Sequence, residues 1–580
     1  MAAKGLRAFV GLPRTVFVSA LLASTALASM PARADQDDFH FRPGHLLLSK
    51  AVYDNKASNI TAGVTQLPPN CVAPNCAAAT TDGIYPMVFS NDLVDSSFGI
   101  TAKIVLDELR LNGHRVQSLE VPNSGQHGVT SNRDQMVTSF PSKSEIGLNL
   151  SIDRHSVSFM GYLAPIDAVD VSNSNTPDVV DSTNPVTSAF SRVIATVDEH
   201  GRFRFTKTNA YSGNNGRAAV LNDRPGANVF YATGNAGNGS NPQPNGVIIG
   251  AGAQIMTAAK APLVDQPDPG LPTPVGSFNV TQLSLKADKI GKDTNFRGLT
   301  VFNDVIYVTK GSGGNGINTV YFIDTSGFDA NGKPLACPNG VGLPSASAKL
   351  PTTPIYYDAS KLQTLGVTPY NMCVLKGFPT NLAKTATSFP FGVWFADAKT
   401  LYVADEGDGT NTFSAATNTY TAAAAQTGAG LQKWVFDDTA KTWKLSYTLQ
   451  AGLGLGIPYT VRDYPTGNNA ATGLPWSPAT DGLRNIIGRV NSDGTASIWA
   501  ITSTVSGGGD QGADPNRLVV IKDKLAATAL PAGETFTTVR TARFAEALRG
   551  VSFTPETGLG RDADDHDGGR PCDRDDDDCR

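Results

Sequence analysis

The sequence predicts an all-β protein folded as a β-propeller, and three observations carry this prediction. Residues 389–449 contain four short apolar runs separated by turn-forming residues, which is the pattern of one four-stranded antiparallel blade. Strand–turn–strand patterns of the same kind recur along the chain, as repeated blades require. The chain also contains 58 Gly and 36 Pro, a composition that favours many turns over long helices.

The blade at residues 389–449 can be divided into two hairpins. Its first strand alternates apolar with small or polar residues up to a break at Asp397–Lys399, and a second apolar run follows at Leu401–Ala404. A Gly- and Asp-rich loop leads to a third run at Leu431–Phe436. Asp437–Lys441 then turns the chain into a fourth run, Thr442–Leu449.

The recurring hairpins predict six blades. The first strands of these blades are expected to start at Glu145, Arg217, Arg297, Phe391, Arg484 and Arg549. The starts are 65–94 residues apart. A compact blade needs roughly 40–45 residues, so the excess length is expected in loops. Two alternatives stay open: a seventh blade within Leu449–Leu483, or a two-sheet sandwich or tandem domains instead of a propeller.

The two ends of the predicted propeller complete each other. His45–Tyr53 is a strand with no first strand before it, and residues 99–109 and 115–121 follow it as a hairpin. Arg549–Glu556 is a first strand followed by nothing except the tail. We therefore expect the C-terminal strand to enter the N-terminal blade, because closure removes the exposed edges of an open array.

Residues 1–34 have the pattern of a secretory signal peptide. Lys4, Arg7 and Arg14 precede or flank the apolar stretch Val16–Ala28, and cleavage is expected after Ala34. A retained membrane anchor is the alternative, but the stretch is short for a span. The mature chain is expected to have no membrane span and to be periplasmic or extracellular. It would comprise a propeller at residues 35–560 and an acidic, disordered tail at 561–580, which carries nine Asp and four Arg.

Cysteine content and charge limit the classes of function. The six cysteines fall as three local pairs, which in an exported chain indicates disulfides. The formal net charge is −5 with no basic stripe, so nucleic acid is not an expected partner. No nucleophile elbow, zinc-protease motif or P-loop is present. The pairs are Cys71 and Cys76, Cys337 and Cys373, and Cys572 and Cys579.

One face of the predicted propeller carries long loops. The loops that join second to third strands fall at residues 234–246, 311–318, 406–430 and 503–516. Long loops on a rigid scaffold are where binding usually resides. We expect these loops to surround a shared ligand site, with unconstrained surface loops as the alternative.

Arginine marks the starts of four predicted inner strands, at Arg217, Arg297, Arg484 and Arg549. Their side chains are expected near the mouth of the central channel. Arginine suits carboxylate or phosphate because its planar fork donates two parallel hydrogen bonds. The site would therefore bind an anion or contain acids, and the alternative is a salt-bridge ring that links neighbouring blades. Candidate acids are Asp405, Glu406, Asp408, Asp510 and Asp514.

An acidic group on a Gly-containing turn suggests a second chemistry. Asp405, Glu406 and Asp408 offer hard oxygen ligands of the kind that calcium prefers. A metal there could act as a Lewis acid on an ester or phosphate oxygen. Solvated loop charges are the alternative.

The run VWFADAKTLYVADEGDGTNT, followed by GLQKWVF, resembles a blade of exported NHL-type or SMP-30-like six-bladed propellers. The resemblance implies blade architecture. SMP-30-like lactonases bind a divalent metal, usually calcium, through acidic and Asn side chains around the channel, and that full set has no match here. Asp405 and Glu406 correspond by location only. NHL-type domains commonly bind proteins or other ligands without catalysis.

Taken together, these features predict an exported propeller that binds a small anionic or carbohydrate-like ligand, or a protein partner, at its loop-rich face. Two alternatives stay open. One is a calcium-dependent hydrolase of a lactone, ester or phosphoester in the central channel. The other is a structural or envelope-associated scaffold.

Overall fold

The structure is a computed structural model. It describes residues 39–54, 56, 59–61, 63–67, 73, 76–79, 99–126, 136–179, 189–235, 252–259, 272–286, 295–327, 335–355, 371–470, 472–508 and 511–559. Residues 1–39 form one unit and residues 40–580 another, and only the second is considered below. The predicted signal peptide at 1–34 and acidic tail at 561–580 lie outside the described residues. Among the described residues, no helix is both long and apolar enough to span a membrane.

Six antiparallel sheets, each built around four strands, make up the fold, as the sequence predicts. Blade 1 orders β30 (Glu546–Phe553), β1 (Leu46–Val52), β4 (Thr101–Leu109) and β5 (Arg115–Glu120), with β6 (Thr138–Ser139) also on β4. Blade 2 comprises β7 (Asn149–Leu150), β8 (Ser156–Tyr162), β9 (Arg192–Asp198) and β10 (Phe203–Thr208). Blade 3 comprises β11 (Gly216–Asn222), β12 (Val229–Gly234), β13 (Ala253–Thr257) and β14 (Thr273–Gly276).

The remaining three blades follow in chain order. Blade 4 orders β15 (Leu299–Phe302), β16 (Val305–Lys310), β17 (Thr319–Ile323) and β19 (Met372–Leu375), with the short β18 (Val341–Gly342) parallel to β19. Blade 5 comprises β20 (Pro390–Asp397), β21 (Thr400–Asp405), β24 (Gly430–Asp437) and β25 (Thr442–Leu449). Blade 6 comprises β26 (Ala479–Val490), β27 (Thr495–Val505), β28 (Arg517–Lys524) and β29 (Thr537–Thr541).

Short elements decorate the loops between these strands. β2 (Gln66–Leu67) pairs with β3 (Ala77–Ala78), and β22 (Phe413–Ser414) pairs with β23 (Thr419–Tyr420) just before the helix α2 (Thr421–Ala425). Single 3-10 turns lie at Val171–Asn173, Val280–Leu283, Ala383–Thr385 and Gln511–Ala513.

The six sheets form a closed ring. Their inner strands contact one another in the order β30, β7, β11, β15, β20 and β26, and β26 contacts β30 again. Residues 450–478 connect β25 to β26 without adding a strand among their described members. The six-bladed alternative is therefore confirmed, and the seven-bladed one is wrong.

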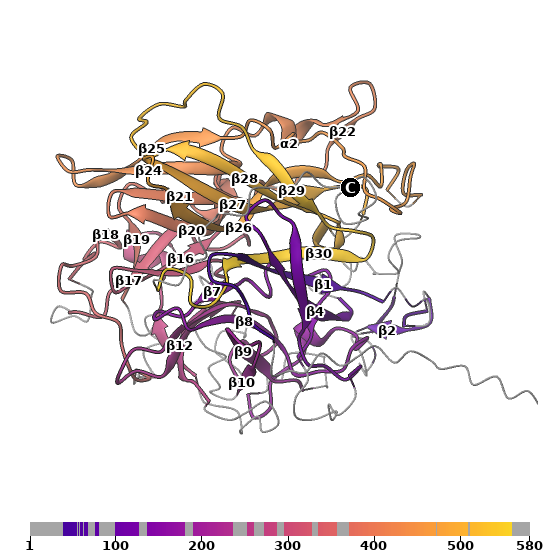
Figure 1. The fold of residues 1–580 in the computed structure, drawn as a ribbon, viewed down its shortest axis with the longest axis horizontal. Coiled ribbons are helices and arrows are strands. Elements are labelled where there is room, and N and C mark those ends of the chain that lie inside the picture. Colours follow the sequence, from indigo (N-terminus) through magenta and orange to yellow (C-terminus); the bar gives the residue numbers. More distant parts are fainter. Residues whose placement is uncertain are drawn as a thin grey trace, which may run out of the picture. The chain divides into compact units, whose positions relative to one another are not determined.

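The C-terminal strand closes the ring, as predicted. β30 pairs antiparallel with β1, from Leu46 opposite Phe553 to Val52 opposite Glu546. Figure 1 shows this yellow strand beside the indigo N-terminal ones. A buried ion pair reinforces the closure, because Lys50 Nζ lies 3.1 Å from Asp107 Oδ2 and 2.8 Å from Glu546 Oε1.

Alternating residues within one strand feed the cores on both sides of a blade. In β21, Leu401 and Val403 join the apolar cluster shared with blade 4, whereas Tyr402 and Ala404 join the cluster shared with blade 6. Side chains of a strand alternate between its two faces, and here both faces are covered by neighbouring blades. This explains why β21 is buried along its whole length.

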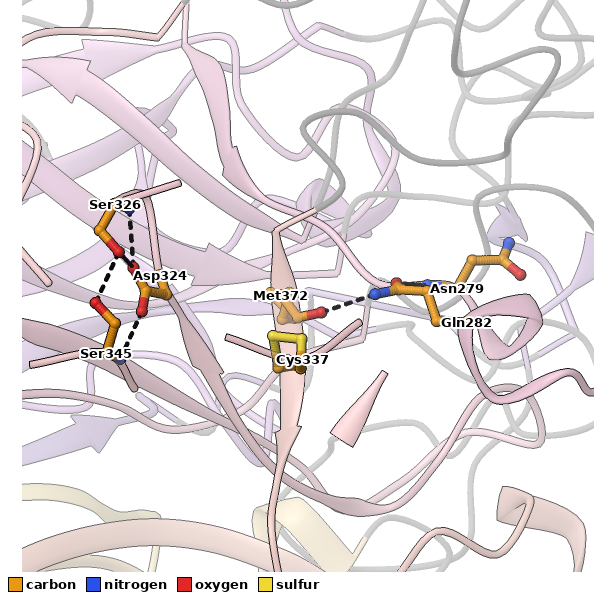
Figure 2. The surroundings of a disulfide bond; sticks show 8 residues. Asn279, Gln282, Asp324, Ser326, Cys337, Ser345 and Met372 are labelled. Atoms are coloured by element: carbon orange, nitrogen blue, oxygen red, sulfur yellow. Dashed lines mark hydrogen bonds between the residues drawn. A yellow bond between two sulfur atoms is a disulfide. The ribbon is translucent and has the colours of Figure 1, made fainter. Parts of the chain in front are cut away.

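A disulfide fixes the long connection between β17 and β19 of blade 4. Cys337 is bonded to Cys373 of β19, with the two Cα atoms 6.0 Å apart. Figure 2 shows its surroundings, where Gln282 Nε2 donates to the Met372 carbonyl at 3.1 Å. Cys76 is also disulfide-bonded. Cys71, Cys572 and Cys579 lie outside the described residues, so their pairing stays a prediction.

On the other side of the same disulfide, a carboxylate gathers two loop segments. Asp324 accepts from the backbone N–H of Ser326 and of Ser345, each at 2.8 Å (Figure 2). The two serine hydroxyls lie 2.9 Å apart. These bonds, together with the disulfide, hold the connection between β17 and β19 against the sheet of blade 4.

Two predicted strand starts need correction. Arg484 and Arg549 lie inside β26 and β30 rather than at their first residues. In β26 the strand begins at Ala479, and Thr480 pairs with Thr504 across an irregular register. Polar residues interrupt the apolar pattern there, so periodicity alone does not mark the true start.

Candidate anion-binding site

The long loops and the starts of the inner strands lie at the same face of the ring. In blade 5, Asp405 at the end of β21 pairs with both Pro390 of β20 and Gly430 of β24. The loop between β21 and β24 therefore leaves the sheet beside the start of β20. The same register joins Ala479 with Val505 in blade 6. The predicted loop-rich face thus has the expected geometry.

Three of the four predicted arginines gather at this face. We call Arg217, Arg297 and Arg484 the arginine cluster, and each is no more than 8% exposed. Arg297 lies just before β15 and donates to the hydroxyls of Ser144 and Ser312. Because Ser144 precedes blade 2, Arg297 reaches from blade 4 to a non-adjacent blade. Side chains at this end of the channel therefore converge.

Glu406 provides the carboxylate nearest to the arginine cluster. Arg484 Nε donates to Glu406 Oε2 at 3.1 Å, and Arg297 Nη2 lies 4.0 Å from Glu406 Oε1. Burial by itself would raise the pKa of Glu406. The charges of Arg297, Arg484 and Lys143 outweigh burial and hold that pKa below its ordinary value. Glu406 is therefore ionised at neutral pH.

Arg217 faces the same cluster but makes no ion pair within hydrogen-bond distance among the described residues. Its Nη1 donates to the Asn295 side chain and, at 3.0 Å, to the Phe296 carbonyl. Burial, and then the positive charge of Arg297, lower the pKa of Arg217 well below its usual value. Two guanidinium groups thus share a buried region in which they repel each other.

The cluster leaves two buried donors without a partner. The Nε–H groups of Arg217 and Arg297 are buried and find no acceptor in the described part of the chain. A buried unsatisfied donor is unfavourable because it has lost its bonds to water. A ligand oxygen that reached these two groups would satisfy them.

Arg549, the fourth predicted arginine, behaves differently. Its Nη2 donates to the carbonyls of Phe140 at 2.5 Å and Gly512 at 2.7 Å. These carbonyls belong to loops next to blades 2 and 6, so Arg549 bridges from blade 1 to both neighbours. These two bonds make Arg549 a structural link between blades.

Two further carboxyls near the cluster are partly protonated at neutral pH. Burial raises the pKa of Asp405 and the pKa of Asp481 to about 7 each. Asp481 accepts from Gly409 N at 2.9 Å and from Gln426 Nε2 at 2.7 Å. At neutral pH these acids are only partly ionised, so they compensate the arginines incompletely.

The predicted calcium ligands do not fit a metal site. Asp405 is occupied by hydrogen bonds, including Phe389 N at 2.7 Å and Gly407 N at 3.1 Å. Glu406 is engaged by arginine, and Asp408 Oδ1 accepts from Thr410 N at 2.8 Å. Among the described residues, no three His, Cys, Asp or Glu side chains are placed to hold a metal ion. The prediction of calcium at these residues is thus not supported by their geometry.

Sequence reasoning missed several polar residues around the channel. Glu145 is fully buried and accepts from Thr138 Oγ1 at 2.7 Å and from Tyr162 OH at 2.5 Å. Arg192 of β9 is also fully buried and donates to the Ser172 carbonyl at 2.9 Å. In the sequence, the available signal for Glu145 and Arg192 was a charged residue that interrupts or opens an apolar run. Asp510 lies outside the described residues.

Comparisons with known proteins give little further information. No protein-family description matches the chain, and no curated protein sequence matches it. One solved structure, described as a polysaccharide lyase PL25 ulvan lyase bound to -[GlcA(1-4)Rha3S]-, is 10% identical, with 88% of this chain and 96% of that chain covered and a TM-score of 0.29. A second ulvan lyase structure has the same identity and coverage and a TM-score of 0.25. TM-scores this low support no conclusion about what this chain does, and none of these matches indicates an NHL-type or SMP-30-like family.

Proposed function

We propose that this protein binds a small anionic ligand at the arginine cluster. The observation that carries the proposal is the pair of buried Nε–H groups on Arg217 and Arg297, which lack an acceptor among the described residues. An oxygen of a carboxylate, sulfate or phosphate would satisfy these donors and would form charge-assisted hydrogen bonds.

The charge balance favours the same class of ligand. Arg297 repels both Arg217 and Arg484, and Lys143 adds a further positive charge beside Glu406, which is the carboxylate bonded to the cluster. Glu145 also contributes negative charge, but four neighbouring donors already bond it. A ligand with one or two negative charges would balance the remaining excess.

The face that holds the cluster favours a small ligand from outside the cell. Long loops surround the starts of the inner strands and can add contacts to a molecule larger than the anionic group itself. An acidic sugar is one member of this class. The disulfide between Cys337 and Cys373 fits an exported protein, for which such ligands are accessible.

Calorimetric titration with citrate, sulfate, inorganic phosphate and glucuronate tests the proposal. We expect at least one of these anions to bind, and we expect Arg297→Ala and Arg484→Ala to weaken binding about tenfold or more. The matched control is Arg202→Ala, because Arg202 is 72% exposed and pairs with Asp198 within its own hairpin. The melting temperature of ligand-free Arg297→Ala should change little, whereas Arg484→Ala should melt lower because it leaves Glu406 buried without the guanidinium that bonds it.

The opposite result would favour the scaffold alternative. If no anion binds and both cluster variants melt at much lower temperature, the arginines serve to tie blades together. The bonds of Arg549 to the loops of blades 2 and 6 already have this structural character. The two outcomes are separated by measuring binding and ligand-free stability on the same variants.

A further inference from the structure

A separate hollow lies between the connector that leads into blade 5 and the third strand of that blade. Its volume is about 330 Å³, which is within the usual range for a small-molecule site. Phe378, Asn381, Thr387 and Ser388 line it from the connector after β19, and Trp434 lines it from β24. Asn318, at the start of β17, completes the wall.

Two largely buried aromatic rings form the apolar part of the wall, and only 6% of each residue is exposed. Phe378 and Trp434 stack with their ring centroids 3.9 Å apart and an interplanar angle of 22°. Trp434 Nε1 donates to Gln432 Oε1 at 3.0 Å, which fixes the orientation of the indole. The connector is equally constrained, because Gly377 has a φ of +107° and an added Cβ would overlap the Trp443 carbonyl.

The rest of the wall offers hydrogen bonds without charge. None of the lining residues is Asp, Glu, Lys, Arg or His. Asn381 and Thr387 are exposed, and their side chains make no hydrogen bond within the described part of the chain. An amide and a hydroxyl are thus available as both donors and acceptors beside the aromatic pair.

We propose that this hollow binds a neutral, hydroxyl-rich ligand, a sugar or a polyol. The apolar C–H face of such a ligand would lie against Phe378 and Trp434, while its hydroxyls would bond Asn381 and Thr387. A free anion lacks a cationic partner here, and a purely apolar molecule would leave the amide and hydroxyl unpaired. A sugar satisfies both parts of the wall.

The hollow is linked to the loop-rich face by shared hydrogen bonds. Ser388 Oγ and Gln432 Nε2 both donate to Asp405 Oδ2, at 3.1 and 3.2 Å. Asp405 immediately precedes Glu406, which pairs with Arg484. The hollow is nevertheless a distinct site, because its lining carries no charge. This proposal does not rest on anion binding at the arginine cluster.

Saturation-transfer NMR with glucose, galactose, mannose, xylose, maltose and glycerol on the full-length protein tests this site. We expect at least one of these probes to bind in the millimolar range. Asn381→Ala and Thr387→Ala should each weaken that binding about three- to tenfold, the effect of losing one neutral hydrogen bond. Both residues are exposed and their side chains make no hydrogen bond to the residues that the structure describes, so both variants are expected to fold normally.

Two control variants locate the signal. Thr417→Ala changes an exposed threonine of the same blade that lies outside the hollow and should have no effect. Arg297→Ala should leave sugar binding intact even if it abolishes anion binding, so failure of one proposal is distinguishable from failure of the other. No saturable signal for any probe up to about 50 mM, well above the millimolar range, would overturn the proposal. So would binding that survives the Asn381→Ala, Thr387→Ala double variant unchanged.

Discussion

Lys433 and Arg297 are both cations buried between blades, yet their surroundings differ in charge balance. Lys433 is fully buried, and its Nζ lies 2.9 Å from Asp523 Oδ2. The same Nζ donates to Tyr447 OH at 2.9 Å and to the Lys524 carbonyl at 2.7 Å. Asp523 matches the ammonium group, and the remaining donors are satisfied by neutral oxygens. Glu534 also bonds Asp523, but burial raises its pKa to about 7, so it is only partly ionised at neutral pH.

The arginine cluster lacks this match. Arg297 and Arg484 share Glu406 as their carboxylate, and the two guanidinium groups repel each other. The buried Nε–H of Arg297 also has no acceptor in the described structure. Burying charge is unfavourable unless pairing is complete. The Lys433 network therefore has the character of a structural link between blades 5 and 6, whereas the arginine cluster has the character of a site that a ligand completes.

The largest expected loss of stability comes from a variant that breaks the Lys433 network. Lys433→Met removes the cation and leaves Asp523 buried without its counter-charge, so we expect a loss of about 3–5 kcal/mol in the free energy of unfolding. Denaturant titration measures this. The control is Lys444→Met, because Lys444 is 61% exposed and its surface pair with Asp437 should contribute little to the free energy of unfolding. A loss below about 1 kcal/mol at Lys433 would contradict the structural role assigned to this network.

An intermediate loss of stability is expected when Glu406, the acid that bonds the arginine cluster, is made neutral. Glu406→Gln removes the counter-charge of Arg297 and Arg484, and we expect a loss of about 2–3 kcal/mol in ligand-free protein, the worth of a hydrogen bond to a charged group. Added sulfate should restore most of this loss, because it can replace the carboxylate. Thermal melts with and without sulfate measure both quantities.

The matched control for this variant is Glu556→Gln. Glu556 bonds His155, which is 61% exposed and lies in the turn between β7 and β8. Its stability should not respond to sulfate. A Glu406→Gln variant that sulfate fails to stabilise would indicate that the cluster does not bind anions.

A pH dependence sharpens the difference in charge. The pKa of Asp481 is raised from 3.8 to about 7 in the folded protein, so the folded state keeps a proton that the unfolded state releases between these values. The free energy of unfolding should therefore fall as pH rises from about 4 to 7, and Asp481→Asn should reduce that slope. Anion affinity should fall about threefold as Asp481 ionises, because its charge opposes that of the ligand. An unchanged slope in Asp481→Asn would contradict the raised pKa.

Local sequence was sufficient to predict the blades. The runs at Leu401–Ala404, Leu431–Phe436 and Thr442–Leu449 lie within or match β21, β24 and β25. Hairpins depend on neighbouring residues, whose alternation and turn chemistry are visible in the chain. Closure was also predictable, because a lone strand at each end leaves few other ways to remove a sheet edge.

The partners of the buried charges were not predictable in this way. The sequence placed Arg217, Arg297 and Arg484 at one face, but not the bond from Arg297 to Ser144, which joins residues 153 positions apart. Nor did it indicate Lys433, whose partner Asp523 belongs to the next blade. Strand periodicity is a local property, so the sequence alone determined the blades and their order. Which charges meet depends on how the blades pack around the ring, and only the tertiary structure decided that.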